Sequence, residues 1–240
     1  YVFHQLPSGI LSPTTINILG NGMLVNLLTL QKEIGQLPDA LRVGLKGRLF
    51  ISNRAHLITP WLIAVEMARK KQLGEGGIGT TMQGIGPTYE AKAARTGVRA
   101  GLLLHPDEFL DALERSWTEA NIELVARGVS PISKSELLDF FEQVSMMADY
   151  VVDTQAMLMH AIAIGQRVLI EGAQGTLLSI DDGTYPDVTS SNTTIAGACT
   201  GLGIPPTAIT GCIGIAKAYI TRVGGGPMVS LIEDQNIFNH

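Results

Sequence analysis

The chain has 240 residues and a mass of 25.6 kDa, a length that can bury a sizeable core. Its 45% hydrophobic and 16% charged residues exclude an intrinsically disordered chain, and a net charge of −5 with scattered Lys and Arg argues against a nucleic-acid partner. No apolar run reaches the roughly 18 to 20 residues of a membrane span, and the N-terminus lacks a signal-peptide pattern, so the sequence predicts no membrane contact and a cytoplasmic location.

The first half of the chain alternates short strands with a helix. Residues 1–30 contain apolar stretches broken by turn residues, which predicts short strands, and residues 48–52 predict another strand. Pro60 opens an expected helix over residues 60–74, because Pro suits a first helical turn and basic residues suit the last. A glycine-dense loop over residues 74–89 is expected to follow.

The second half begins with two predicted helices. Residues 106–127 have helical apolar spacing and end at Gly128, and the capping-box pair Ser133 and Glu136 opens a long helix expected over residues 134–164. Apolar segments 167–171 and 213–221 predict further strands. Strands alternating with helices predict an α/β fold with a mostly parallel central sheet, in which sites form at the carboxyl ends of strands.

The cysteines and histidines give no sign of a metal or catalytic centre. Cys199 and Cys212 stand in apolar Gly/Ala surroundings, which predicts buried reduced thiols. The five histidines are dispersed without ligand spacing, so each is interpreted as structural or surface. The sequence predicts sites that hold a phosphate, with no catalytic residue and no metal ligand in this chain.

The first of three polar segments covers residues 74–90. Six glycines stand in its first thirteen positions, and Thr80 and Thr81 offer hydroxyl donors, which favours an anion site over a solvent loop. Three cations follow at a spacing that suits one helix face: Lys92, Arg95 and Arg99.

The second segment, residues 171–186, follows the predicted strand 167–171. Gln174, close to Gly172 and Gly175, could donate its side-chain amide to a phosphate or a base edge. The neighbouring pair Asp181 and Asp182 suggests a metal site or acid–base chemistry, but a turn that ends at Gly183 is the favoured interpretation.

The third segment is Thr189 to Thr194, six polar residues that include Asn192 and precede a run of small apolar residues. It predicts the start of a helix, whose free N–H groups favour a phosphate. A simple helix cap needs only one such residue, so six in succession favour a binding role.

Residues 84–95 fit the signature G-I-G-P-x-Y-x-x-K-x-x-R at every fixed position, and on this basis the chain resembles adenylosuccinate synthetase. Other segments typical of that family occur in family order: residues 6–10, 20–22, 54–57, 171–177, 183–186, 188–194 and 217–224. The resemblance covers nearly the whole chain.

The resemblance implies a fold related to P-loop NTPases and GTP-dependent ligation of L-aspartate to inosine monophosphate (IMP), giving adenylosuccinate, GDP and phosphate in AMP biosynthesis. GTP first phosphorylates the 6-oxygen of IMP, and the aspartate amine then displaces that phosphate. The resemblance assigns IMP binding to Thr81, Gln174 and Thr189, with Val223 near the ribose. It assigns supporting loop roles to Thr80, Gly84, Gly86, Gly172, Gly175, Asn192 and Gly224.

The resemblance also implies partners and missing parts. Arg95 would reach across a homodimer interface to the phosphate held by the other subunit. Mg²⁺ and GTP would be required, with their ligands mostly outside this chain. Residues 1–240 would form a single partial domain, with the family's N-terminal phosphate loop before residue 1 and its guanine- and aspartate-binding region after residue 240.

Several positions depart from the family pattern. Met82 and Gln83 replace a usual Gly-Arg pair, which removes a cation that Gln cannot replace in pairing with a carboxylate. Other departures are Leu62, Ser179, Asp182 and the run 228–231. These departures keep a second interpretation open, in which the chain is a non-catalytic relative that binds a nucleotide or dimerises.

Overall fold

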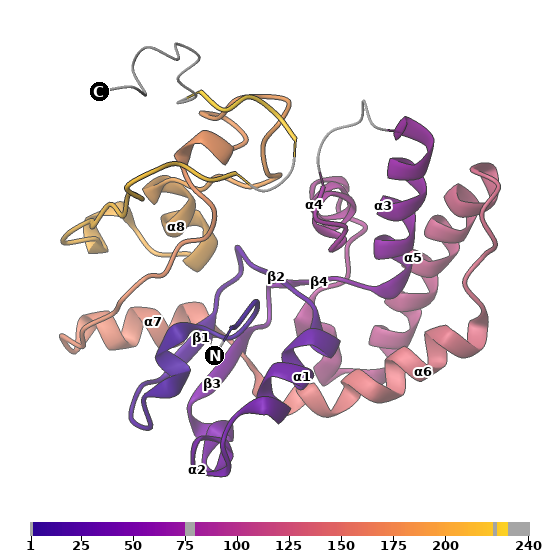
Figure 1. Cartoon of the computed structure of the whole chain (residues 1–240). Helices are drawn as coiled ribbons and strands as arrows, with labels where there is room; N and C mark the ends of the chain where they lie inside the picture. Colours follow the sequence, from indigo (N-terminus) through magenta and orange to yellow (C-terminus); the bar gives the residue numbers. More distant parts are fainter. Residues whose placement is uncertain (1, 75–79, 223–224, 230–240) are drawn as a thin grey trace, which may run out of the picture.

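The computed structural model describes residues 2–74, 80–222 and 225–229. Its strands form two small parallel sheets, one with the order β1-β3-β5 and one that pairs β2 with β4 (Figure 1). The strands are β1 (Asn17–Leu19), β2 (Leu24–Val25), β3 (Leu49–Ser52), β4 (His56–Leu57) and β5 (Val151–Val152). The parallel α/β arrangement expected from the sequence is confirmed.

The helices surround these strands. They are α1 (Leu27–Gln36), α2 (Asp39–Arg42), α3 (Pro60–Leu73), α4 (Ile85–Ala94), α5 (Pro106–Ala126), α6 (Lys134–Ser145), α7 (Thr154–Ala163) and α8 (Ile195–Leu202). Helix α3 packs against both α4 and α5, and α5 packs against α6. Residues 165–222, orange to yellow in Figure 1, lie on the opposite side of the strands from α3, α5 and α6.

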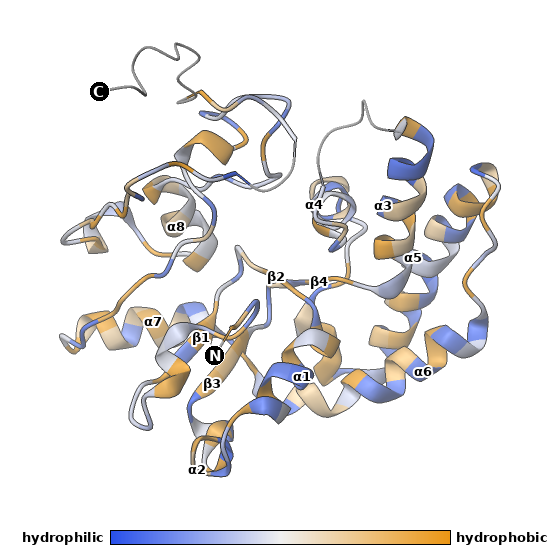
Figure 2. Ribbon diagram, in the orientation of Figure 1, coloured by the Kyte–Doolittle hydropathy of each residue, from blue (hydrophilic) through white to orange (hydrophobic). Residues whose placement is uncertain are grey.

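The core lies where α3, α5 and α6 meet the strands. Trp61 is fully buried, donates its indole N–H to the hydroxyl of Ser116 (2.9 Å) and meets the ring of Phe140 edge-on at 5.5 Å. In Figure 2, α3, α5 and α6 each show both blue and orange residues. Packing of the buried residues of these helices in the core fixes α3, which in turn positions the first polar segment.

Several predicted elements are confirmed with small shifts of boundary. The strand expected over residues 48–52 is β3, and the helices expected over 60–74 and 106–127 are α3 and α5. Ser133 and Glu136 form the expected capping box, in which the Ser133 hydroxyl accepts from the N–H of Glu136 (3.3 Å). The N-terminal strands β1 and β2 are present, but α1 begins at residue 27, inside the region expected to be strands.

The single long helix predicted over residues 134–164 is wrong. The chain leaves α6 at Ser145, forms a 3₁₀ turn, enters β5 and starts α7 at Thr154. Val151 and Val152 pair with β3, where β-branched side chains are favoured, and the Asp153 carboxylate caps α7 by accepting from the N–H of Ala156 (3.1 Å). The apolar residues between 146 and 152 therefore belong to a 3₁₀ turn and a strand, and not to a continuous helix.

The strands predicted over 167–171 and 213–221 are also absent from the structure. Neither segment pairs with a strand, and Leu169 and Ile215 are 88% and 95% exposed. A strand needs a hydrogen-bonded neighbour, and none of the described residues provides one for these two segments.

The cysteines are less buried than the sequence predicts. Cys199 is half-buried and Cys212 is exposed, and both are free thiols.

Arg69 of α3 is half-buried and joins Glu123 of α5 (2.7 Å) and Glu90 of α4 (2.5 Å). This bridge ties three helices together.

Candidate functional site

Glu66 of α3 holds the described part of the first polar segment. Its carboxylate accepts one hydrogen bond from the hydroxyl of Thr80 (2.6 Å) and another from the N–H of Gly84 (2.6 Å). Thr81 lies between these two anchored points, and it is exposed. We call residues 80–84 the clamped loop; residues 75–79 of the same segment lie outside the described residues.

Gly84 is the point at which the clamped loop becomes a helix. Its φ of 76° is in the left-handed region, and an added Cβ would lie 2.9 Å from the side chains of both Ile58 and Ile63. The Gly84 carbonyl accepts from the hydroxyl (2.6 Å) and the N–H (3.2 Å) of Thr88. The prediction of a loop through residue 89 is therefore wrong, because these contacts start α4 directly after Gly84.

The second and third polar segments are joined by hydrogen bonds. The N–H of Thr189 donates to the carbonyl of Leu178 (2.8 Å), and the hydroxyl of Thr193 donates to the carbonyl of Gly175 (2.8 Å). The two segments therefore form one folded unit, although the strand expected before the second segment is missing.

Gln174 is exposed on this unit, with a positive φ of 60°. Gly172 and Gly175 are also exposed, with open space where a Cβ would be placed. The neighbouring Glu171 accepts from the N–H (3.2 Å) and the hydroxyl (2.8 Å) of Ser8, which attaches the unit to the N-terminal part of the chain. The glycines near Gln174 leave room for a ligand to approach the backbone.

Asn192 has a structural role in the third segment. Its side-chain oxygen accepts from the N–H (2.9 Å) and the hydroxyl (2.6 Å) of Thr194, and its amide nitrogen donates to Asp181 (3.4 Å). The Thr194 side chain makes no capping hydrogen bond to α8. The expected helix after the third segment is confirmed, and its first N–H groups have no side-chain cap.

The turn at residues 20–22 brings the first and third segments together. The hydroxyl of Tyr89, on α4, donates to the carbonyl of Gly22 (2.9 Å), and the N–H of Gly22 donates to the carbonyl of Gly201 on α8 (2.7 Å). Burial raises the pKa of Tyr89, and a hydrogen bond with Ser191 opposes that rise. A residue of the third segment therefore contacts the helix that follows the clamped loop.

A basic cavity of about 450 Å³ opens beside the C-terminal end of α4. It is lined by Asn53, His56, Lys92, Arg95, Gly97, Arg99, Gly101, Leu102 and His105. Lys92, Arg95 and Arg99 do not share one helix face, since α4 ends at Ala94, but the cavity gathers them. No carboxylate of the described residues pairs with the guanidinium of Arg95 or Arg99, so the cavity attracts anions.

The floor of the basic cavity contains two unsatisfied polar atoms. Nδ1 of His56 and Oδ1 of Asn53 are buried without a hydrogen-bond partner. Burial, helped by the charges of Lys92 and Arg99, lowers the pKa of His56 to about 4, so its ring is neutral at pH 7. His56 therefore adds no charge to the cavity at neutral pH.

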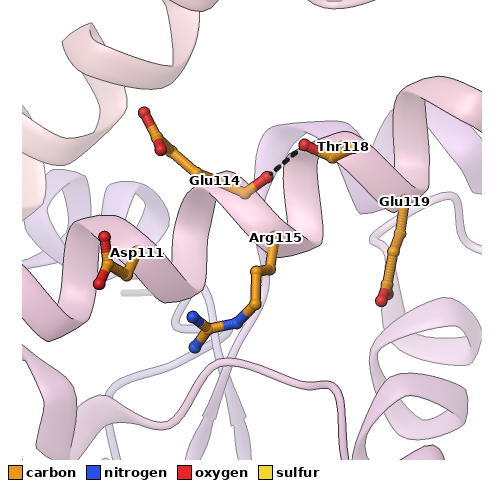
Figure 3. A pocket seen from close by; sticks show the side chains of 5 residues that line it. All are labelled: Asp111, Glu114, Arg115, Thr118 and Glu119. Carbon is orange, nitrogen blue, oxygen red and sulfur yellow. Dashed lines mark hydrogen bonds between the residues drawn. The ribbon is translucent and has the colours of Figure 1, made fainter.

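A second depression of similar size lies along α5. Asp111, Glu114, Arg115, Thr118 and Glu119 line it, and Figure 3 shows side chains that spread along one helix without converging on a common point. The drawn hydrogen bond joins the Thr118 hydroxyl to the Glu114 carbonyl. This surface offers no ligand geometry. No group of three or more His, Cys, Asp or Glu in the described part of the chain could hold a metal ion.

The chain matches the family model for adenylosuccinate synthetase over residues 1–239.

It belongs to the adenylosuccinate synthetase family.

An adenylosuccinate synthetase from Paramecium tetraurelia is 46% identical over 95% of this chain and 52% of its own length. One from Syntrophotalea carbinolica is 42% identical over 98% of this chain and 55% of its own length. The chain thus spans about half the length of the curated relatives it matches.

Two solved structures are similar. A fully ligated adenylosuccinate synthetase from Plasmodium falciparum superimposes with a TM-score of 0.87 and 35% identity, covering 98% of this chain and 54% of that chain. A cyanophage S-2L succinoaminodeoxyadenylate synthetase, bound to dGMP and dATP, superimposes with a TM-score of 0.51 and 21% identity over 87% of this chain and 47% of that chain. The second likeness shows the fold alone.

Positions that depart from the adenylosuccinate synthetase pattern lie in different surroundings. Met82 and Gln83 are exposed in the clamped loop. Ser179 is fully buried and its hydroxyl is 3.5 Å from Asp182, in the same turn. Leu62 packs against the core.

The C-terminal candidate positions cannot all be placed. Val223 and Gly224 lie outside the described residues, as do residues 230 and 231 of the departing run 228–231. Met228 and Val229 are exposed.

Sequence reasoning missed three residues that assemble the site: Glu66, Tyr89 and Ser191. The helix that contains Glu66 has no unusual sequence pattern. The hydrogen-bond partners of Glu66 follow fourteen and eighteen residues later, beyond the range of any local motif. Tyr89 belongs to the recognised signature, but nothing in that signature predicts its contact with Gly22. These residues act through tertiary contacts, which local patterns do not encode.

Proposed function

We propose that this chain forms the IMP-binding part of an adenylosuccinate synthetase, which joins L-aspartate to IMP with consumption of GTP. Thr81, Gln174 and Thr189 bind IMP, mainly at its 5′-phosphate, and Val223 lies near the ribose. In the reaction GTP phosphorylates the 6-oxygen of IMP, and the aspartate amine displaces that phosphate to give adenylosuccinate. Membership of the family and the full-chain likeness to a ligated relative support this function.

The observation that carries the proposal is the hydrogen-bonded connection between the polar segments. Tyr89 of α4 donates to Gly22, whose N–H donates to Gly201 of α8, and the third segment is bonded to the second through Thr193 and Gly175. Three parts of the chain that are distant in sequence and rich in hydroxyls and glycine are thus linked, which supports the proposal that they bind one phosphate.

Arg95 is proposed to act in trans in a homodimer. It is exposed, ends α4 with a φ of 67° and lines the basic cavity. Charge-assisted contacts are worth roughly 1.5 to 3 kcal/mol, so an Arg supplied by the partner would couple dimerisation to IMP affinity.

GTP and Mg²⁺ are proposed as co-substrate and cofactor. Most ligands of Mg²⁺ and GTP are proposed to lie outside this chain. Among the described residues no helix has the length and apolar composition to cross a bilayer. We further propose that residues 1–240 form one partial domain and that the enzyme is cytoplasmic.

A non-catalytic relative that binds a nucleotide or dimerises is the second candidate. It is favoured by one observation: in the clamped loop, Gln83 stands where the family usually has Arg, and the loop contains no cation. Such a protein would bind IMP without forming adenylosuccinate.

The test is adenylosuccinate formation from IMP, GTP and aspartate by the full-length protein, compared with Arg95→Leu. We expect turnover in the wild type and a KM for IMP about tenfold or more higher in the variant, from the loss of a charge-assisted contact. Arg115→Leu is the matched control, because Arg115 is exposed on α5 away from the site. IMP binding without turnover would support the nucleotide-binding form of the second candidate instead. No IMP binding would exclude both the ligase and a relative that binds IMP.

A further inference from the structure

We propose that Glu66 is a positioning residue for phosphate binding, which fixes the clamped loop so that the Thr81 hydroxyl faces the IMP phosphate. The inference rests on the proposed function, because it concerns how the same site is held. Glu66 itself does not touch the substrate.

Each carboxylate oxygen of Glu66 accepts a different hydrogen bond. Oε1 of Glu66 accepts from the Thr80 hydroxyl and Oε2 accepts from the N–H of Gly84, both at 2.6 Å. These bonds fix the residue just before Thr81 and the residue that ends the loop. Since Glu66 is half-buried and no cation of the described residues pairs with it, its role in the folded chain is that of a hydrogen-bond acceptor.

Glu66 also satisfies a backbone donor at the start of α4. Gly84 is the cap residue of α4 and has no side chain that could accept a hydrogen bond. Its own N–H donates to the carboxylate from α3, and its carbonyl accepts from Thr88 of α4. Both polar groups of the Gly84 backbone are thus paired, and the start of α4 cannot shift relative to α3 without breaking the bond between the Gly84 N–H and Glu66.

This arrangement determines what remains for a ligand. The Gly84 N–H and the Thr80 hydroxyl proton are both used by Glu66, and the N–H of Met82 donates to the Thr80 oxygen (3.1 Å). The exposed Thr81, with no such contact to the clamp, presents its hydroxyl from a fixed backbone. Removal of the carboxylate would free the loop and increase the cost of ordering Thr81 when the phosphate binds.

Two substitutions separate hydrogen bonding from charge. Glu66→Ala removes both acceptors. Glu66→Gln keeps an oxygen for the Gly84 N–H, and its NH₂ can donate to the Thr80 oxygen, because a hydroxyl can act as donor or acceptor. Glu119→Ala is the matched control, since Glu119 is an exposed carboxylate on α5 without a role in the clamp.

The first measurement is steady-state kinetics of the full-length protein with IMP varied. We expect Glu66→Ala to raise the KM for IMP about tenfold with kcat changed less than threefold, and Glu66→Gln and Glu119→Ala to stay within threefold of the wild type. A KM for IMP in Glu66→Ala equal to that of the wild type would overturn the inference. So would a loss of kcat at unchanged KM, because that result would place Glu66 in catalysis.

The second measurement needs no ligand and separates failure of this inference from failure of the proposed function. Amide hydrogen exchange of residues 80–88 should be at least tenfold faster in Glu66→Ala than in the wild type, with α5 unchanged. If the wild type does not bind IMP, the proposed function fails and with it the role of the clamp in phosphate binding. Unchanged exchange in Glu66→Ala would show that Glu66 does not hold the loop, even in an active enzyme.

Discussion

Three non-glycine residues of the described chain have a left-handed backbone: Met82, Arg95 and Gln174. L-residues rarely adopt this conformation, because the Cβ approaches the following carbonyl oxygen. Each of the three lies in a segment proposed to handle the IMP phosphate. The conformational cost is therefore concentrated in the site, where tertiary contacts such as the Glu66 clamp keep the backbone in place.

Met82 offers a direct test of this strain. Met82→Gly should leave the protein more stable than Gln83→Gly by about 1 to 2 kcal/mol, because both variants gain the same unfolded-state freedom and only position 82 loses left-handed strain. The measurement is the urea midpoint of both variants. Equal midpoints would show that the backbone at Met82 is not strained.

His56 makes stability depend on pH. Its pKa is about 4 in the folded protein against 6.5 when unfolded, so the unfolded chain binds more protons between these values. The stabilisation from a neutral His56 is complete above pH 6.5 and is lost as the pH falls toward 4. The groups that face it are Lys92 and Arg99, with His105 and Arg95 on the same cavity.

The lowered pKa of His56 corresponds to about 3 kcal/mol in the free energy of unfolding. Solvent at the mouth of the cavity reduces this contribution to about 2 kcal/mol. His56→Gln should therefore lose about 2 kcal/mol less stability than the wild type between pH 7 and pH 4.5. Thermal melts at half-unit pH intervals measure the difference. Parallel curves for the two proteins would show that His56 does not titrate in this range.

At the scale of elements, the start of α4 depends on a glycine that no other residue can replace. Gly84→Ala should destabilise the protein by about 2 to 4 kcal/mol, because the Cβ would meet two isoleucine side chains at 2.9 Å in a left-handed backbone. Gly35→Ala is the control, and its expected effect on the free energy of unfolding has the opposite sign. Gly35 is exposed in α1 with no atom near an added Cβ, so alanine should stabilise by about 0.5 to 1 kcal/mol. Calorimetric melts of both variants test the pair; stabilisation by Gly84→Ala would contradict the geometry.

Helices and strands whose ends are set by adjacent residues in the sequence could be predicted. Those whose ends are set by contacts with distant parts of the chain could not. Pro60, Pro106 and the Ser133 capping box mark helix starts that depend on adjacent residues, and the structure confirms them. The break between α6 and α7 depends on pairing of β5 with β3, fully a hundred residues earlier in the chain, so apolar periodicity missed it. The start of α4 was missed because its cap comes from Glu66 on another helix.

At the scale of the whole molecule, the chain leaves apolar segments uncovered. Leu169, Ile213 and Ile215 are each at least 86% exposed, in segments with strong strand propensity. Exposed segments of this kind promote association through unpaired backbone groups. Residues 165–229 are therefore the part of the chain where association is expected.

We expect the 240-residue chain to self-associate, and Ile213→Ser combined with Ile215→Ser to reduce light scattering several-fold at equal concentration. Ile122→Ser is the control, because Ile122 is exposed on a regular helix outside this segment. Scattering that falls equally in the control would mean that general hydrophobicity, and not this segment, drives association.

Glycine and threonine clusters identified the three polar segments from sequence without tertiary information, and their role as an anion site stays a prediction. How the segments are connected, through Tyr89, Gly22 and Ser191, follows only from the fold. The proposed role of this assembly is to hold a purine monophosphate.

Titration calorimetry of IMP into the full-length protein tests that claim most directly. We predict one site per chain, with affinity reduced about tenfold by Thr81→Val, which removes the hydroxyl at nearly constant volume, and unchanged by Arg115→Leu. No heat with IMP, or equal affinity in the wild type and Thr81→Val, would contradict the account.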